Sequence, residues 1–348
     1  MSKRKPIIVV TGFLGSGKTT FLKHLIKNSN KKFGLLINEF GDVGIDGDLI
    51  KTCSSCNDDS IIELNNGCIC CTVQEDFIPA IKTLLNQNIE LDGIVIETSG
   101  LALPIPLLSA LSWPEIRSSV YLEMVIGLIN GESMLNGLPI NNLNEIRMQY
   151  QDTQIIDHEI SFDELFEEQL QASDLVLVSR SDLIEDKYFH DIKTTVKTKL
   201  NPNVPVIKCL NGEINLEYIL GSNYQTQFQQ TNKKFHTHDH NHIELHSKSI
   251  KCNYFLEKSE FEKEILQIIE NLKILRIKGR IWIPGKLLPL QVQIVGTKVN
   301  TWYEESPNDC WKPKQGGLEM ISIGFEKDLL ILLEKKIKEK FNVLSVSN

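Results

Sequence analysis

The sequence lacks several features that would mark it as a membrane, nucleic-acid-binding or disulfide-stabilised protein. It has no apolar run of about eighteen residues, so we expect no transmembrane helix. Positive charge is not in excess, because 37 Lys and Arg face 45 Asp and Glu. The resulting net charge of −8 argues against sequence-independent binding to nucleic acid or to an anionic membrane. Eight cysteines in 348 residues are too few for a disulfide scaffold.

The N-terminal residues also lack the pattern of a secretory signal. The apolar run that follows the basic start breaks at Thr11 and Gly12, where a signal peptide would continue. We therefore expect a cytoplasmic protein.

The strongest positive signal is a phosphate-binding motif in residues 12–19. Residues 7–10 are β-branched and apolar, which predicts a buried strand, and GFLGSGKT then fits GxxxxGK[ST] ahead of a helical pattern. In such a loop the backbone N–H groups converge on phosphate oxygens. Lys18 is expected to reach the terminal phosphates and the Thr19 hydroxyl to ligate Mg²⁺, both in catalytic roles. The other predicted nucleotide contacts in this stretch are Gly12, Gly15, Ser16, Gly17 and Thr20.

Two acidic segments follow predicted strands and are expected at the same sheet edge. Residues 38–47 form a glycine-rich acidic loop where a nucleotide-sensing switch would lie, although Gly and Asp also favour ordinary turns. The predicted strand that begins at residue 91 ends in Glu97, followed by Gly100. This is the spacing of the acid-x-x-Gly element that senses Mg²⁺ and the γ-phosphate, so we predict a catalytic Glu97 and a nucleotide-contacting Gly100.

Five of the eight cysteines are clustered in residues 53–71, which indicates metal or redox chemistry. Cys68, Cys70 and Cys71 form a CxCC triplet whose thiolates would select zinc, Cu(I) or an iron–sulfur cluster. Cys53 and Cys56 precede it as a CxxC pair and could complete a tetrahedral site. Alternatively, these side chains are ordinary small buried hydrophobes.

The order of predicted elements indicates two domains. Strands alternate with helices over residues 1–220, which predicts an α/β P-loop NTPase with a doubly wound, mostly parallel sheet. Residues 221–248 form a polar linker with alternating histidines, either a weak metal-acquisition tract or a solvated spacer. Residues 249–348 predict a smaller α+β domain. Its expected strands are 249–256, 274–283 with a kink at the glycine, 288–299 and 318–325, and its expected helices are 260–272 and 327–340.

In their order, these motifs resemble those of the CobW-like family of metal-handling GTPases, relatives of the nickel-insertion GTPases of hydrogenase and urease maturation. The Cys triplet after Asn-Gly is the most specific mark. The resemblance implies that residues 12–19 bind GTP and Mg²⁺ and that residues 97–100 belong to the switch. It also implies that the Cys triplet holds a transferred metal. Glu39 and Asp46 would belong to the acidic loop between nucleotide and metal.

Two positions depart from the family pattern. Family members usually carry NKxD for guanine, whereas this chain has SRSD, which keeps Asp182 but places Ser179 where Asn is expected. Arg180 would supply the stem that packs on the base. A strand that tends to end in aspartate ends here in Asn130. GTP remains the favoured nucleotide, with ATP as the alternative.

The sequence thus predicts a GTP-hydrolysing metallochaperone with slow intrinsic turnover, which carries Zn²⁺ or another divalent transition metal to a client metalloprotein. A nucleotide- or metal-dependent homodimer is compatible with this function. Two alternatives stay open: an activator of a metal-cofactor protein, for example one with a corrinoid, and a non-catalytic nucleotide-binding regulator with a structural zinc site.

Overall fold

The computed structural model describes residues 3–38, 61–64, 76–87, 90–135, 162–201, 203–220, 246–253, 257–270, 272–306, 310–313 and 316–342. The chain divides into two compact units, Met1–Leu216 and Glu217–Asn348. Across these described ranges, no helix combines the length and the apolar character needed to cross a membrane.

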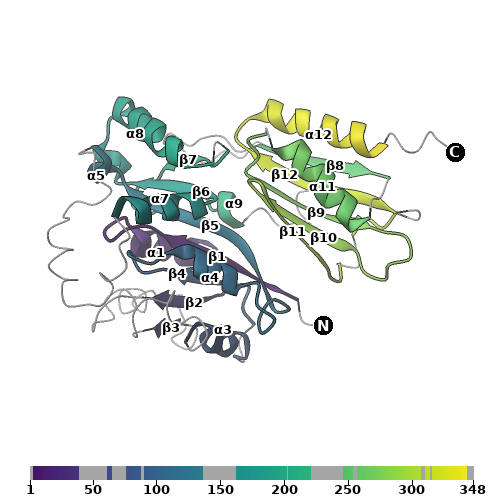
Figure 1. Ribbon diagram of the computed structural model, residues 1–348, viewed down its shortest axis with the longest axis horizontal. Coiled ribbons are helices and arrows are strands. Elements are labelled where there is room, and N and C mark those ends of the chain that lie inside the picture. Colours follow the sequence, from purple (N-terminus) through teal and green to yellow (C-terminus); the bar gives the residue numbers. More distant parts are fainter. Residues whose placement is uncertain are drawn as a thin grey trace. The chain divides into compact units, whose positions relative to one another are not determined.

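The first unit is built on a seven-stranded sheet in the order β3-β2-β4-β1-β5-β6-β7 (Figure 1). Every neighbouring pair in it is parallel. The strands are β1 (Lys5–Thr11), β2 (Phe33–Asn38), β3 (Ile61–Leu64), β4 (Gly93–Glu97), β5 (Val120–Asn130), β6 (Leu175–Ser179) and β7 (Val206–Lys208). Since β1 lies between β4 and β5, the segments that follow these three strands meet at one edge of the sheet.

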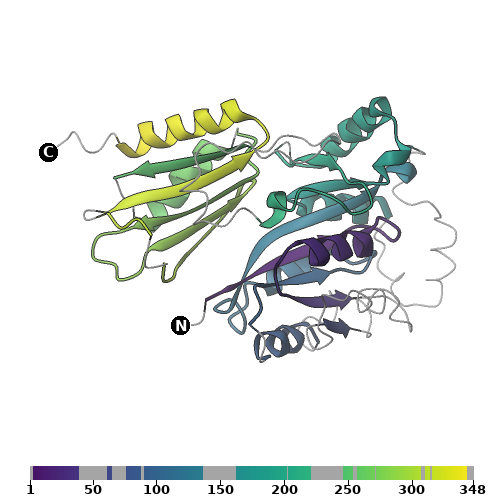
Figure 2. The ribbon, with the colours of Figure 1, turned by 180° about the vertical axis from the view of Figure 1, so that it is seen from behind.

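Helices cover both faces of this sheet, which explains why β1 is apolar at successive positions. Figure 1 shows α4 (Pro104–Ala110) and α7 (Phe162–Ala172) in front of the sheet, and Figure 2 shows α1 (Lys18–Asn28) in front of the opposite face. Ile7, Ile8, Val9 and Val10 are accordingly all buried. The remaining described α-helices of this unit are α3 (Ile78–Leu85), α5 (Gly131–Leu135) and α8 (Asp186–Lys199). The predicted α/β P-loop architecture with a parallel sheet is confirmed.

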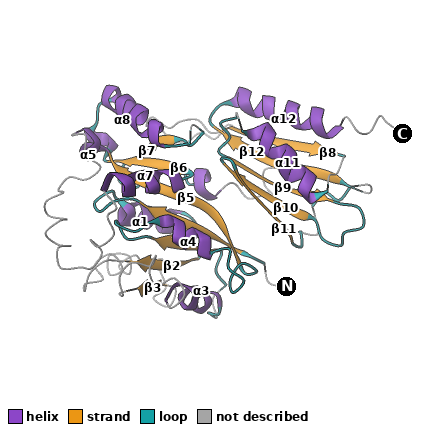
Figure 3. Ribbon diagram, viewed as in Figure 1, coloured by secondary structure: helices purple, strands orange, loops and turns teal. Residues whose placement is uncertain are grey.

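The second unit has a five-stranded antiparallel sheet in the order β11-β10-β9-β12-β8 (Figure 3). Two helices pack on one face and enclose an apolar core that includes Phe261, Ile281, Met320 and Leu333. The elements are α9 (Glu217–Leu220), β8 (His246–Cys252), α11 (Lys258–Ile269), β9 (Arg276–Trp282), β10 (Leu290–Val295), β11 (Lys298–Tyr303), β12 (Gly317–Gly324) and α12 (Lys327–Asn342).

Two local expectations for the second unit are wrong. The single strand expected over residues 288–299 is a hairpin of β10 and β11, because Gly296 has φ +56 and reverses the chain between Val295 and Lys298. The kink expected at Gly279 is absent, since β9 pairs in unbroken register through this residue on both sides. A Cβ at this position would lie 2.3 Å from Cγ of Met320, so the glycine permits close packing of the neighbouring strand.

Candidate nucleotide-binding site

The predicted phosphate loop connects β1 to α1, and its backbone requires glycine at two points. Gly12 has φ +138, and a Cβ there would lie 2.2 Å from the carbonyl oxygen of Leu128. Gly17 has φ +96 and is the residue before the first helical turn, which begins at Lys18. These conformations allow the loop to pass close to β5 and then turn directly into the helix.

Lys18 lies folded over the loop. Its side chain is buried, and Nζ donates to the carbonyl oxygens of Gly12 at 2.8 Å and Phe13 at 3.2 Å. The hydroxyl of Ser16 is buried without a hydrogen-bond partner among the described residues. A buried donor of this kind fits a phosphate oxygen as its partner. Thr19 is half-buried in the first turn of α1, and Thr20 is exposed.

The acid-x-x-Gly segment lies directly beside the phosphate loop. Glu97 ends β4 opposite Val10 of β1 and is buried. The next residue, Thr98, donates its backbone N–H to the carbonyl oxygen of Val10 at 2.9 Å. Gly100 then touches the loop itself, because a Cβ there would lie 2.6 Å from the backbone nitrogen of Leu14. The structure thus brings Glu97 and Gly100 to the phosphate loop.

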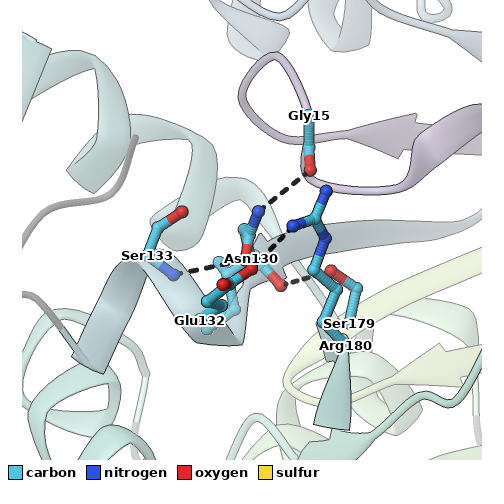
Figure 4. Close-up of polar contacts among 7 residues, drawn as sticks. Gly15, Asn130, Glu132, Ser133, Ser179 and Arg180 are labelled. Atoms are coloured by element: carbon cyan, nitrogen blue, oxygen red, sulfur yellow. Dashed lines mark hydrogen bonds and ion pairs between the residues drawn. The ribbon is translucent and has the colours of Figure 1, made fainter. Parts of the chain in front are cut away.

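A network of polar contacts connects the end of β5 to the phosphate loop and to the SRSD segment (Figure 4). Asn130 is buried; its Nδ2 donates to the carbonyl oxygen of Gly15 at 3.2 Å, and its Oδ1 accepts from the N–H of Ser133 at 3.2 Å. Glu132 forms an ion pair with Arg180 at 2.6 Å. A carboxylate at position 130 could accept the bond from Ser133 but could not donate to Gly15.

The SRSD segment begins against the phosphate loop and ends exposed. A Cβ at Gly17 would lie 3.3 Å from Cβ of Ser179, whose hydroxyl donates to the carbonyl oxygen of Ile129 at 3.2 Å. Arg180 has φ +51, a left-handed conformation that turns the chain into the short helix η4 (Ser181–Leu183). Asp182 is exposed in this turn. The segment is thus placed beside the phosphate loop, with Asp182 open to a ligand.

Gln169 on α7 is a site residue that the sequence did not predict. Its side chain is buried, and Nε2 donates to the carbonyl oxygens of Gly100 at 3.1 Å and Ala102 at 3.2 Å. A glutamine within an acidic amphipathic helix carries no motif, so only the packing of α7 beside residues 100–102 reveals it.

The predicted metal ligands Cys68, Cys70, Cys71, Glu39 and Asp46 lie outside the described residues. So do Cys53, Cys56 and the histidines of the predicted linker up to His242. Within the described ranges, no group of three or more His, Cys, Asp and Glu side chains is arranged to hold a metal ion.

Two of the three described cysteines, Cys209 and Cys252, are buried and poorly suited to bind a metal. Burial, as the largest cause, raises the pKa of Cys209 to about 12. Burial also raises the pKa of Cys252. Metal binding requires thiolates, and the raised pKa values of these two side chains disfavour the thiolate form.

Comparisons with known proteins agree with this geometry. Residues 6–208 match the family described as CobW/HypB/UreG, nucleotide-binding domain, and residues 248–340 match the cobalamin synthesis protein cobW C-terminal domain. A zinc chaperone CobW from Sinorhizobium sp is 37% identical over 311 residues, which cover 86% of this chain and 88% of the relative. The zinc chaperone YjiA of Escherichia coli (strain K12) is 26% identical over 351 residues, which cover 96% of this chain and 97% of the relative.

Among solved structures, the Zn(II)-bound YjiA GTPase from E. coli is 20% identical and aligns over 97% of this chain and 99% of its own, with a TM-score of 0.40. The sequence matches, which cover both units, confirm the family expected from the motifs.

Proposed function

Because the chain belongs to the CobW/HypB/UreG family, we propose that it is a GTPase that binds a divalent metal ion, zinc in the first place, and delivers it to a client metalloprotein. The observation that carries the proposal is the contact between the switch segment at Gly100 and the phosphate loop at Leu14. Loss of the terminal phosphate from the nucleotide at this contact would affect the positions of both segments.

The nucleotide chemistry is assigned to the residues around the phosphate loop. Lys18 neutralises the terminal phosphates, Ser16 and the loop N–H groups bind them, and Asp182 reads the guanine edge. Mg²⁺ would be ligated by the Thr19 hydroxyl and sensed by the Glu97 carboxylate. It would supply the charge that stabilises the transferred phosphoryl group. Turnover is expected to be slow, since the sequence offers no evident arginine finger.

The metal is assigned to Cys68, Cys70 and Cys71, with Glu39 and Asp46 in the acidic loop between nucleotide and metal. Sequence supports this assignment, because three thiolates in four positions favour zinc. The names of the relatives from Sinorhizobium and E. coli, both zinc chaperones, support it as well. Binding requires deprotonated cysteines, so metal uptake should release protons and weaken as pH falls.

We further assign nucleotide and metal binding to residues 1–220, a connecting role to residues 221–248 and client docking to residues 249–348. Nucleotide binding would order the switch segments, and hydrolysis would remove their contacts to the γ-phosphate and release the metal. A cytoplasmic location and a nucleotide- or metal-dependent homodimer belong to the same proposal.

The test is a zinc titration of the full chain and of a variant with Cys68, Cys70 and Cys71 changed to serine, each with and without non-hydrolysable GTP. We expect the wild type to bind zinc with an affinity that depends on the nucleotide, and the variant to lose this binding while it still binds GTP. Equal affinity in all four combinations would contradict the proposal. Zinc that cannot be removed by chelators without unfolding the chain would indicate a structural site instead.

A further inference from the structure

Gln169 holds the switch segment from outside the nucleotide motifs. Its side chain is only 2% exposed on α7, and Nε2 donates to two carbonyl oxygens, those of Gly100 at 3.1 Å and Ala102 at 3.2 Å. Both carbonyls belong to the segment that follows Glu97. One buried amide therefore fixes two peptide units, and the first of them begins at the glycine proposed to sense the γ-phosphate.

The peptide that Gln169 fixes is the one that touches the phosphate loop. A Cβ on Gly100 would lie 2.6 Å from the nitrogen, 2.7 Å from Cγ and 3.1 Å from Cα of Leu14. The backbone at residue 100 therefore rests on the loop with no space for a side chain. With α7 holding its carbonyl and the loop lying against its Cα, a small movement of Gly100 changes its approach to the terminal phosphate.

Stability alone does not explain a glutamine at this position. Its Oε1 is buried and accepts no hydrogen bond from any described residue. The cost of burying an unpaired amide oxygen offsets part of the stabilisation that the two donor hydrogen bonds provide. An apolar side chain of the same length would avoid this desolvation cost, but it would leave the carbonyls of Gly100 and Ala102 without their donor and could not hold Gly100 in place.

We propose that Gln169 is a positioning residue for GTP hydrolysis: it sets the backbone of Gly100 for the γ-phosphate and thereby makes the site distinguish triphosphate from diphosphate. This inference rests on the proposed GTPase function and adds a residue of α7 to it. The residue acts through Gly100 and touches no reacting atom. Its loss should therefore alter kcat and the preference for GTP over GDP, while GDP affinity is retained and the chain still folds.

The experiment compares the full-length wild type with Gln169→Met, which keeps the length of the side chain and removes both donor bonds. Ser173→Ala is the matched control, because Ser173 is buried directly after the C-terminus of α7 and its hydroxyl donates to the backbone carbonyl of Gln169 at 2.7 Å. The measurements are kcat and KM for GTP, the Kd values of GDP and a non-hydrolysable GTP analogue, and the midpoint of thermal unfolding.

For Gln169→Met we expect kcat to fall by about tenfold or more and the preference for the GTP analogue over GDP to shrink, with GDP affinity within about twofold of wild type. The unfolding midpoint is expected to fall modestly, because the carbonyls of Gly100 and Ala102 lose their shared donor while the unpaired Oε1 is removed. Ser173→Ala should keep wild-type kcat and nucleotide preference. If the methionine variant does not fold, Gln169→Asn, whose amide is one methylene short of Gly100, is expected to give the same split.

Two results would overturn the inference: kcat and nucleotide preference unchanged in the variant, or equal losses of affinity for GDP and for the GTP analogue, which would indicate a purely structural role. A wild type without GTP hydrolysis would contradict the proposed function. The ratio of analogue to GDP affinity would then still decide the role of Gln169.

Discussion

At the scale of single residues, side-chain amides connect neighbouring segments at the nucleotide site by hydrogen bonds. Asn130 bonds to the phosphate loop through its NH₂ group and to α5 through its oxygen, so both halves of the amide are used. Gln169 uses its NH₂ group for the switch segment. Carboxylates of the same shape could not donate these bonds.

Asn130→Asp tests the donor bond to the loop. We expect nucleotide affinity to fall by about tenfold, because the bond to Gly15 is lost and a negative charge is placed near the phosphates. Fluorescence titration with labelled GDP measures this. Asn201→Asp is the control: Asn201 is exposed after α8, and its Oδ1 accepts from Asn203 much as that of Asn130 accepts from Ser133. Equal affinity for both variants would show that Asn130 does not position the loop.

The difference between predicted and missed residues has a physical cause. Glu97 and Gly100 could be predicted beside the phosphate loop because parallel strands end at a common edge, which follows from the strand pattern alone. Gln169 could not, since its contact depends on which turn of α7 packs against residues 100–102. The bonds of Asn130 likewise depend on the path of the loop after β5.

At the scale of elements, the sequence predicted well those segments whose apolar pattern is long enough to read. α11, β12 and α12 lie within a few residues of their expected positions. β3 was missed because it has only four residues, and the hairpin of β10 and β11 was merged because the apolar pattern continues across the turn at Gly296. A short strand gains its stability from pairing in the sheet, and its own sequence reveals little of this.

The packing of α12 on β8 has a pH-dependent component centred on Glu334. Its carboxylate bonds to Lys338 at 2.7 Å and to Lys248 of β8 at 2.9 Å. Burial raises the pKa of Glu334, but the hydrogen bonds and charges of the two lysines outweigh burial and hold the pKa below its usual value. A lowered folded-state pKa stabilises the fold above the unfolded pKa, and this stabilisation is lost as pH falls through the folded pKa.

Glu334→Gln should therefore lower the free energy of unfolding by about 1 kcal/mol at neutral pH, and the difference from wild type should disappear in acid. Denaturant unfolding of the full chain at a series of pH values measures this. Glu339→Gln is the control, since Glu339 pairs with Lys335 at 3.8 Å with both side chains largely exposed. A difference from wild type that is constant with pH would contradict the assigned role of Glu334.

At the scale of the whole molecule, each unit matches a family domain, the first over residues 6–208 and the second over residues 248–340. The relative from Sinorhizobium spans both, with 86% of this chain aligned. Fold and phosphate chemistry could be predicted from sequence because they rest on local motifs. The metal-binding role of the Cys triplet was predicted from sequence as well. It remains a prediction because residues 65–75 lie outside the described part of the chain.

The central claim is that GTP hydrolysis controls how tightly the chain binds its metal ion. The most direct measurement is a single-turnover experiment in which the zinc-loaded chain hydrolyses GTP in the presence of a coloured zinc chelator, with phosphate and chelated zinc followed together. We predict that zinc reaches the chelator at the rate at which phosphate forms, and that a non-hydrolysable GTP analogue suppresses the transfer. Zinc transfer at the same rate with GTP, GDP and the analogue would contradict the claim.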